Sequence, residues 1–404
     1  MIRALFVDDE PAVLEGLENR LRRLRSRWKI SFADRAETAL EKLTVQPFDV
    51  VVSDLRMPGM DGASLLELVR AMHPGAIRIA LTGGSGAELL LATLSSAHQV
   101  LSKPCDAQLL DAVVVRVRAL HGWLGDEALR QRLAGLSRLA PLPALREQLA
   151  RTLEAPDAKL GEVAAIVECD AAWTARLLQL ANSAFSGVGR SVTSGRDAAK
   201  YLGLNILREI AASTELFESI DPNRVGPAFS LEHVHAHSLR CARIASRLLS
   251  DESERKSAFT AAVLHDLGRV LLAVSAPGYL AAALERAQNE SVPLHVAEYA
   301  VHGFSHAEVG AYLLALWGVP APIVEAVAHH HCPSRSQEST FGPIGALHVA
   351  DCLCQEAQLS AAGTPCAELP AAALDSAYLE RAAVRDRVDA WREMVARDFS
   401  SQSV

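Results

Sequence analysis

Residues 49–62 read DVVVSDLRMPGMDG, and this stretch decides the fold of the first part of the chain. Residues 50–53 are mostly β-branched, which is typical of a buried parallel strand. The strand leads into a carboxylate, Asp54, and turn-forming residues follow before a helical pattern begins at Ala63. Open α/β sheets bind their ligands at the carboxyl ends of the strands, so we expect Asp54 to lie at such an edge.

Polar side chains also follow three other predicted strands. These strands and the residues after them are 2–7 with Asp8 and Asp9, 77–81 with Thr82, and 100–101 with Lys103. Together with Asp54 they are expected to converge on one edge of the sheet. Three carboxylates suit a hard cation such as Mg²⁺, and Thr and Lys suit phosphoryl oxygens. The alternative to a shared site is that loop carboxylates follow these strands by chance. The set of Asp8, Asp9, Asp54, Thr82 and Lys103 is specific enough to favour a site.

This pattern resembles the receiver domain of response regulators, over residues 1 to about 120. The resemblance implies a doubly wound, five-stranded parallel α/β fold and a cognate sensor histidine kinase as partner. It also implies a set of roles. Asp54 accepts the phosphoryl group, Thr82 is the switch hydroxyl and Lys103 pairs with the phosphate. The implied Mg²⁺ ligands are Asp8, Asp9, Asp54 and the backbone carbonyl of Arg56.

One position departs from the receiver pattern. The family usually has an aromatic residue two positions before the Lys, where this chain has Leu101. A carboxylate nucleophile needs a cation that offsets the charge of the incoming phosphoryl group, and the departure leaves that requirement met. The usual coupling between the Thr and the aromatic side chain, however, is not expected in its full form.

Length, charge and composition limit the classes of function. The 404 residues predict two or three domains. A net charge of −8 and a pI near 6.0 argue against nucleic-acid binding, which needs a basic surface. No apolar run reaches the roughly 18 residues of a membrane span, so no membrane segment is expected. The seven cysteines form no paired CxxC motifs, which fits the reduced thiols of a cytoplasmic protein.

The remainder of the chain has a helical pattern. Residues 106–133 have the apolar spacing of an amphipathic helix, with a break near Gly122. We predict a receiver domain at 1–121, a helical linker at 122–135, a helical domain at 136–335 and a C-terminal helical extension at 336–404 that packs on it. The linker is either an ordinary connection or a signalling helix.

The helical part resembles the HDOD family. The matching features are Leu142-Pro143, Asp170 as a helix cap, the run LLQLANS at 177–183, and Tyr201-Leu202-Gly203. The family usually has Pro after the Asp, where this chain has Ala171. The resemblance implies an all-α bundle related to metal-dependent HD phosphohydrolases, an activity that most HDOD proteins have lost.

Histidines and carboxylates recur in the order found in HD phosphohydrolases. In those enzymes a first His, a His-Asp pair and a last Asp bind a metal that activates water, and the HD-GYP relatives add histidines for further metals. The residues that could supply such a set, for Mn, Fe or Zn, are His237, His265, Asp266, His306, His330, His331 and Asp351. The alternative is a group of satisfied core residues, which a lone His on an alanine-rich helix usually is.

Two departures weigh against hydrolysis. Residues 332–337, CPSRSQ, replace the Gly-Tyr-Pro loop after the His pair, and Arg269 replaces the Lys expected three residues after the HD Asp. Arg pairs with phosphate but is a poor proton donor. The first hypothesis is therefore a phosphorylation-dependent response regulator that signals to a downstream protein through contacts of its helical domain. The alternative is a phosphorylation-gated metal phosphohydrolase that acts on a cyclic nucleotide or phosphate ester.

The last receiver helix leads directly into the linker. In the receiver family, phosphorylation re-shapes the face built from the fourth helix, the fifth strand and the fifth helix, which here begins at Asp106. We expect this face to pack on the helical domain or on a second copy of the chain in a homodimer. Phosphorylation is expected to change that packing.

Overall fold

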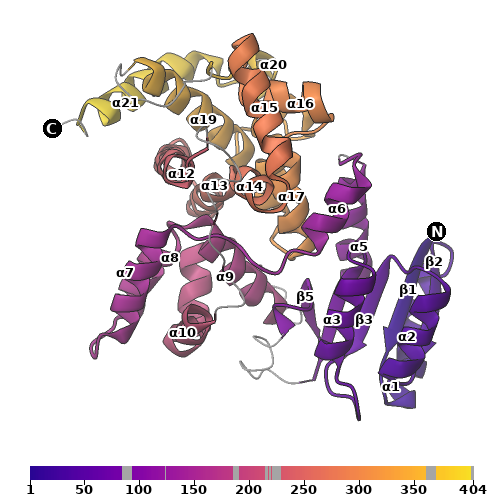
Figure 1. Ribbon diagram of the computed structural model, residues 1–404. Helices are drawn as coiled ribbons and strands as arrows, with labels where there is room; N and C mark the ends of the chain where they lie inside the picture. Colours follow the sequence, from indigo (N-terminus) through magenta and orange to yellow (C-terminus); the bar gives the residue numbers. More distant parts are fainter. Residues whose placement is uncertain are drawn as a thin grey trace.

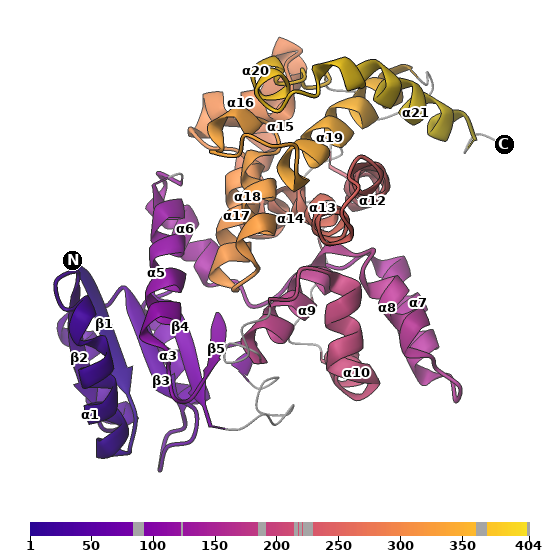
Figure 2. The same ribbon diagram turned by 180° about the vertical axis from the view of Figure 1, so that it is seen from behind.

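The computed structural model consists of an N-terminal α/β part and a larger helical part (Figure 1). The residues that it describes are 1–83, 93–122, 124–184, 191–213, 217, 220, 229–360 and 370–401. Seen from either side, α5 and α6 lie beside α17, and strand β5 lies beside α9 (Figures 1 and 2).

Five parallel strands form one sheet in the order β2-β1-β3-β4-β5. They are β1 Ile2–Val7, β2 Trp28–Ala33, β3 Val50–Asp54, β4 Ile77–Thr82 and β5 Gln99–Ser102. The central strand β3 is buried at every position, as its β-branched sequence predicts. The expected five-stranded parallel α/β fold is confirmed, and the carboxyl ends of its strands share one edge.

The helices that flank the sheet are α1 Pro11–Arg20, α2 Ala36–Val45, α3 Gly62–Met72 and α5 Ala107–His121, with a 3₁₀ turn at Leu21–Leu24. Asp61 is the N-cap of helix α3: its side chain accepts a hydrogen bond from the Ser64 amide at 2.8 Å, which stabilises the start of the helix. The first residue, Gly62, has to lack a side chain. A Cβ there would lie 1.8 Å from the Asp54 carbonyl oxygen. The loop is thus held against the backbone of Asp54.

The expected linker region contains helix α6 Glu127–Ala134. The helices that follow are α7 Pro143–Glu154, α8 Leu160–Val167, α9 Ala171–Ala184, α10 Gly195–Ala212, α12 Leu231–Arg247, α13 Glu252–Leu264, α14 Leu267–Ser275, α15 Pro277–Glu290, α16 Leu294–His302, α17 His306–Leu316, α18 Ala321–His329, α19 Pro343–Ser360, α20 Ser376–Arg381 and α21 Val388–Ser401. The expected helical fold of this part is confirmed. Helix α9 starts at its predicted cap, because Asp170 accepts from the Trp173 amide at 3.0 Å and from the Leu142 amide at 2.8 Å.

Two close packings bring the later helices together. Helices α12, α13, α18 and α19 pack against one another, and α14 packs on α17. The second crossing is so tight that a Cβ at Gly268 would lie 1.9 Å from the His306 carbonyl oxygen. The start of α14 is therefore held next to the start of α17.

The edge of the sheet packs on the helical part. Helix α5 lies on α17, and β5 lies on α9. The Gln99 side chain donates from Nε2 to the carbonyl oxygen of Leu316 at 2.9 Å, and Gln179 donates to that of His98 at 3.0 Å. This packing agrees with the expectation that the β5 and α5 face lies on the helical domain. The expected fourth receiver helix falls in a region that includes residues 84–92, outside the described residues.

Two buried arginines hold the junction. Arg78 on β4 donates to the carbonyl oxygens of Ser96 and Ala134, each at 2.8 Å, and Arg176 on α9 stacks 3.9 Å from the ring centre of Trp317. Burial lowers the pKa of both guanidinium groups to about 9. A buried cation is costly unless its donors are paired, so the bonds of Arg78 hold Ala134 of the linker against β4, and the Arg176 stacking holds α9 against the end of α17.

The expectation of no apolar segment of membrane-spanning length needs one correction. Among the described residues, Glu252–Ser275 is long and apolar enough to cross a membrane, with a mean hydropathy of 1.4. However, 83% of this window is buried inside the protein, and the stretch contains the His265-Asp266 pair. A buried core helix has the same hydropathy as a membrane span, so packing accounts for the apolar character of this stretch.

Candidate functional sites

The first candidate site lies where strands of the sheet end. Asp8 and Asp9 directly follow β1, Asp54 is the last residue of β3, and Lys103 directly follows β5. One carboxylate oxygen from each of the three Asp residues lies within 4.8 Å of the other two. The convergence that the sequence predicts is therefore present. Clustered carboxylates of this kind fit a small divalent cation that prefers oxygen ligands.

Lys103 balances part of the negative charge at this edge. Its Nζ lies 2.7 Å from Asp8 Oδ2 and 2.9 Å from Asp54 Oδ1. Burial alone would lower the pKa of Lys103, but hydrogen bonds with the two carboxylates outweigh burial and raise it. Burial also raises the pKa of Asp54, and Lys103 opposes that shift. The ammonium thus lies where it can contact oxygens on a group attached to Asp54.

The other predicted residues of this site lie nearby. Thr82 is the last residue of β4 and is largely buried. Arg56 lies on the loop from β3 to α3, two residues after Asp54, and the role of its carbonyl stays a prediction. Leu101 is buried in β5 opposite Leu81. A core side chain thus fills the position where the receiver family usually has an aromatic residue.

The second candidate site lies inside the helical part, where five segments meet. The seven histidines and aspartates predicted from the sequence lie in one cluster: His237 on α12, His265 and Asp266 between α13 and α14, His306 at the start of α17, His330 and His331 after α18, and Asp351 on α19. The seven residues that were selected by their order in the sequence therefore lie close together in the fold.

One half of the cluster is centred on Asp351. His237 Nε2 lies 2.9 Å from Asp351 Oδ1, and His265 Nε2 lies 4.0 Å from the same oxygen. The Nδ1 of His265 donates to the Ala262 carbonyl oxygen at 2.7 Å, which directs the Nε2 lone pair into the cluster. Burial would raise the pKa of Asp351, but the contact with His237 lowers it by a larger amount. Asp351 therefore keeps its charge.

The other half is centred on His306. Its Nε2 lies 3.2 Å from Asp266 Oδ1 and 3.0 Å from His331 Nε2, and its Nδ1 lies 2.6 Å from Glu298 Oε2. Burial would lower the pKa of His306, but the Glu298 and Asp266 carboxylates raise it to about 10. Burial holds the pKa of His330 and His331 well below the usual range. The carboxylates thus favour a positive charge here, while the paired histidines stay neutral.

Three buried polar atoms of the cluster have no hydrogen-bond partner among the described residues. They are His330 Nε2, His331 Nδ1 and Asp351 Oδ2. His331 Nδ1 and Asp351 Oδ2 face each other at 3.7 Å, too far for a hydrogen bond. Neutral imidazole nitrogens and carboxylate oxygens are metal ligands, and unpaired buried polar atoms are costly. The residues present therefore fit a transition metal such as Mn, Fe or Zn.

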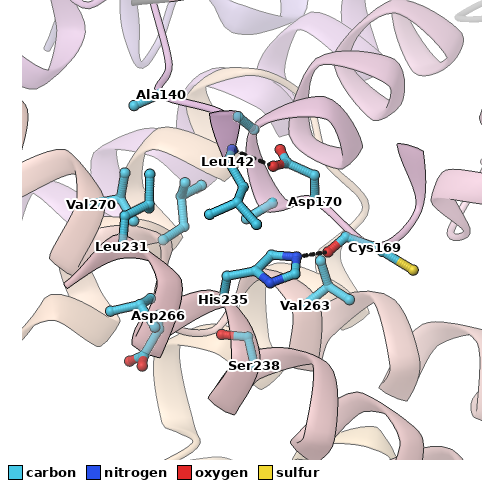
Figure 3. Close-up of a pocket in the computed structure, with 14 residues that line it drawn as sticks. Ala140, Leu142, Cys169, Asp170, Leu231, His235, Ser238, Val263, Asp266 and Val270 are labelled. Atoms are coloured by element: carbon cyan, nitrogen blue, oxygen red, sulfur yellow. Dashed lines mark hydrogen bonds between the residues drawn. The ribbon is translucent and has the colours of Figure 1, made fainter. Parts of the chain in front are cut away.

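Access to the cluster is restricted. Arg269 Nη1 donates to Asp266 Oδ2 at 2.8 Å, on the oxygen that does not face His306. A neighbouring cavity of about 20 Å³ has room for roughly one water molecule. Figure 3 shows Asp266 at the border of this cavity, with its carboxylate turned away from Leu142 and Asp170. The seven residues are buried or half-buried, so little of the cluster is exposed to a phosphate ester.

Sequence reasoning missed two residues of this region. Glu298 orients His306, and nothing near it in the sequence marks that role. Cys241 lies one helical turn after His237, and its sulfur is 3.5 Å from His237 Nε2. The four-residue spacing of His237 and Cys241 on a predicted helix was the available signal, because such residues share a helix face.

Metal removal gives a direct test of the second site. We expect the full-length chain to bind a transition metal, and His265→Ala and Asp266→Ala each to abolish binding, because these ligands come together only in the folded protein. At a free metal concentration of about 100 times Kd, bound metal stabilises the fold by about 2.7 kcal/mol, a gain that both variants should lose. Metal content and the thermal unfolding midpoint measure the two effects.

His233→Ala is the matched control for this test, because His233 lies on α12 but is exposed and outside the cluster. It should bind metal like the wild type. Equal metal content in the wild type and both cluster variants would reject the site.

Comparisons with known proteins recognise both parts of the chain. Residues 4–115 match the response regulator receiver domain, and residues 139–333 match the HDOD domain. An uncharacterized protein of Treponema pallidum is 27% identical over 205 residues, which are 49% of this chain and 38% of that protein. The response regulator protein PilR of Pseudomonas aeruginosa is 32% identical over 151 residues, 37% of this chain and 33% of PilR. The chain thus spans little more than a third of these curated relatives.

Two solved structures are also similar. The MmoQ response regulator from Methylococcus capsulatus is 23% identical, with 64% of this chain and 98% of that chain covered and a TM-score of 0.48. An HDOD domain protein from Geobacter sulfurreducens is 24% identical, with 70% and 98% covered and a TM-score of 0.37. The two domain matches thus show that the chain carries a response regulator receiver domain followed by an HDOD domain.

Proposed function

We propose that this chain is a phosphorylation-dependent response regulator that signals through protein contacts of its HDOD domain. A sensor histidine kinase supplies the phosphoryl group, and Asp54 accepts it. The observation that carries the proposal is the position of Lys103 Nζ, within 3 Å or so of both Asp8 and Asp54 at the edge where the strands end. The downstream partner is a protein, in keeping with the net charge of −8.

Each residue of this edge has a proposed role in phosphoryl transfer. The Asp54 carboxylate is the nucleophile, and Lys103 pairs with an oxygen of the incoming group. Asp8, Asp9, Asp54 and the Arg56 carbonyl would hold Mg²⁺, which offsets negative charge on the phosphoryl oxygens when bound. The Thr82 hydroxyl would hydrogen-bond to the phosphorylated Asp54.

Labelling by a small phosphodonor tests the first step. We expect acetyl phosphate to label the chain only with Mg²⁺ present, and Asp54→Asn to abolish labelling because it removes the nucleophile. Asp49→Asn is the matched control, since Asp49 directly precedes the same strand at its opposite end. Its labelling should equal that of the wild type. Undiminished, acid-stable labelling of Asp54→Asn would contradict the proposal.

The junction between the domains supports a route for the signal. Lys103 contacts Asp54 from one end of β5, and Gln99 at the other end of that strand contacts the last residue of α17. A phosphoryl group adds roughly −1.5 to −2 charges. The added charge would draw Lys103 and Thr82 toward the phosphoryl group. A resulting shift of β5 would change the hydrogen bond between Gln99 and the Leu316 carbonyl oxygen.

The size of the coupling is bounded. Moving a population from 1:99 to 99:1 takes about 5.5 kcal/mol of differential stabilisation, whereas allosteric couplings are typically about 1–3 kcal/mol. Leu101 also removes the aromatic side chain that usually moves with the Thr. We therefore propose a graded shift in the packing of the β5 and α5 face rather than a complete switch.

Hydrogen exchange with and without beryllium fluoride, a phosphoryl mimic, tests this coupling. We expect protection to change in residues 93–122 and in α9 or α17, because β5 and α5 pack on those helices. The Asp54→Asn variant should show neither change. Changes confined to the receiver domain would mean that the two domains are merely tethered.

The histidine cluster favours a second candidate function, a metal-dependent phosphohydrolase gated by phosphorylation. All seven residues that the HD order predicts lie together, and three of their ligand atoms lack hydrogen-bond partners among the described residues. The restricted access and Arg269 weigh against this function. Arg269 would bind a phosphate oxygen in an opened cluster but would donate a proton poorly.

This second function predicts that the chain, loaded with Mn²⁺ or Fe²⁺, hydrolyses cyclic nucleotides or bis(p-nitrophenyl) phosphate. Asp266→Asn should abolish turnover, because it removes a metal ligand, and Arg269→Lys should raise it by restoring a proton donor. Product release over time measures both effects. A metal-loaded chain that leaves every phosphodiester intact would reject hydrolysis and leave the first function standing.

A further inference from the structure

The proposed metal site has a neighbour that the HD pattern does not contain. Cys241 lies four residues after His237 on α12, so both side chains are on the face that packs against α13 and α19. Its sulfur, one nitrogen each of His237 and His265, and one oxygen of Asp351 all lie within 4.8 Å of one another. These four residues are called the Cys241 set below.

We propose that Cys241 is a metal ligand together with His237, His265 and Asp351, and that the Cys241 set selects zinc over manganese or iron. The proposal rests on the helical domain binding a metal, as argued above, and adds the identity of that metal and its fourth ligand. A thiolate is a soft ligand, and sites that mix thiolate with imidazole suit zinc, whereas manganese prefers carboxylate and water.

One distance within the Cys241 set matches that expected around a tetrahedral zinc ion, and two others lie above and below the expected value. Zinc with a Zn–S bond of about 2.3 Å and Zn–N bonds of about 2.0–2.1 Å places sulfur and nitrogen about 3.5 Å apart. Cys241 Sγ lies 3.5 Å from His237 Nε2. The nitrogen-to-oxygen separations from Asp351 Oδ1, 2.9 Å to His237 and 4.0 Å to His265, lie on either side of the value of about 3.4 Å that such bonds require.

Cys241 is a buried thiol that has polar groups next to its sulfur. Its sulfur faces the His237 ring and the Ala350 carbonyl oxygen, 3.9 Å away, and it hydrogen-bonds to the Cys354 thiol. Asp351 has, in addition, a buried oxygen without a hydrogen-bond partner among the described residues. That oxygen is Oδ2, which faces His331 Nδ1 at 3.7 Å, whereas the Oδ1 atom of the Cys241 set contacts His237 and accepts a hydrogen bond from Gln355.

Burial determines what such an ion could do. Cys241 is fully buried, His265 and Asp351 are each 1% exposed, and His237 is 8% exposed. Structural zinc sites have four protein ligands, whereas catalytic sites keep one position open for water or substrate. Zinc in the Cys241 set would therefore join α12, α13 and α19 rather than catalyse. Hydrolysis would then require a second ion on the other side of the cluster, where Asp266 lies with His306, His330 and His331.

Cobalt substitution of the full-length chain tests the assignment, because Co²⁺ bound to a thiolate has a near-ultraviolet charge-transfer band that nitrogen and oxygen ligands do not produce. We expect this band in the wild type and its loss in Cys241→Ser. Zinc affinity should fall by more than the roughly 10–100-fold cost of a lost outer-shell partner. Cys352→Ser is the matched control, since Cys352 is buried on α19 but lies outside the set. It should keep both the band and the affinity.

The outcomes distinguish this inference from the proposal on which it rests. Cobalt that binds without a thiolate band would overturn the role of Cys241 but leave a metal site of histidines and carboxylates. No binding at all would reject both, while phosphorylation of Asp54 would be unaffected. If Cys241→Ser fails to fold, the Cys354→Ser variant shows whether Cys354 rather than Cys241 supplies the thiolate. A band that persists in Cys354→Ser and Cys352→Ser supports Cys241, and one that disappears in Cys354→Ser overturns its assignment.

Discussion

The Lys103 ammonium between two buried carboxylates is the contact on which the proposed coupling of the two domains depends. It neutralises charge at an edge that would otherwise bring three aspartates together unopposed. Because Lys103 directly follows the four-residue strand β5, the same contact fixes one end of that strand. The other end is fixed by Gln99, which donates to the Leu316 carbonyl oxygen. A change in charge at Asp54 thus acts on a short element that also belongs to the domain junction.

Helix α17 extends that relation into the helical domain. It begins at His306, in the histidine cluster, and ends at Leu316, on the receiver junction. Its 11 residues make a rigid rod about 16 Å long. Every residue of α17 is buried, so the helix cannot move without moving its neighbours. The carboxylate edge of the sheet and the histidine cluster are therefore connected by one strand and one helix, which is the physical basis for the proposal that both act in one signalling unit.

The carboxylate edge of the sheet could be predicted from the sequence, because the signals for it lie within a few residues of one another. Each polar residue directly follows an apolar run, so finding the strand also finds the residue. The edge strand β2 was not located, since Lys29 and Ser31 interrupt its apolar run. The histidine cluster was predicted from order alone, by resemblance. Gln99 and Glu298 could not be predicted, because their roles depend on backbone and side-chain groups that only the folded chain brings near.

The histidine cluster costs the helical domain folding free energy, because it buries charged groups. Burying charged groups is expensive, and well-packed apolar residues of similar size are often as stable or more stable. This core nevertheless buries Asp266, Asp351 and Glu298, with Arg269 and a proton on His306 as the nearby positive charges. Three ligand atoms still lack hydrogen-bond partners among the described residues. A cation would offset this cost and would give the three atoms a partner, which is the physical argument for the proposed metal site.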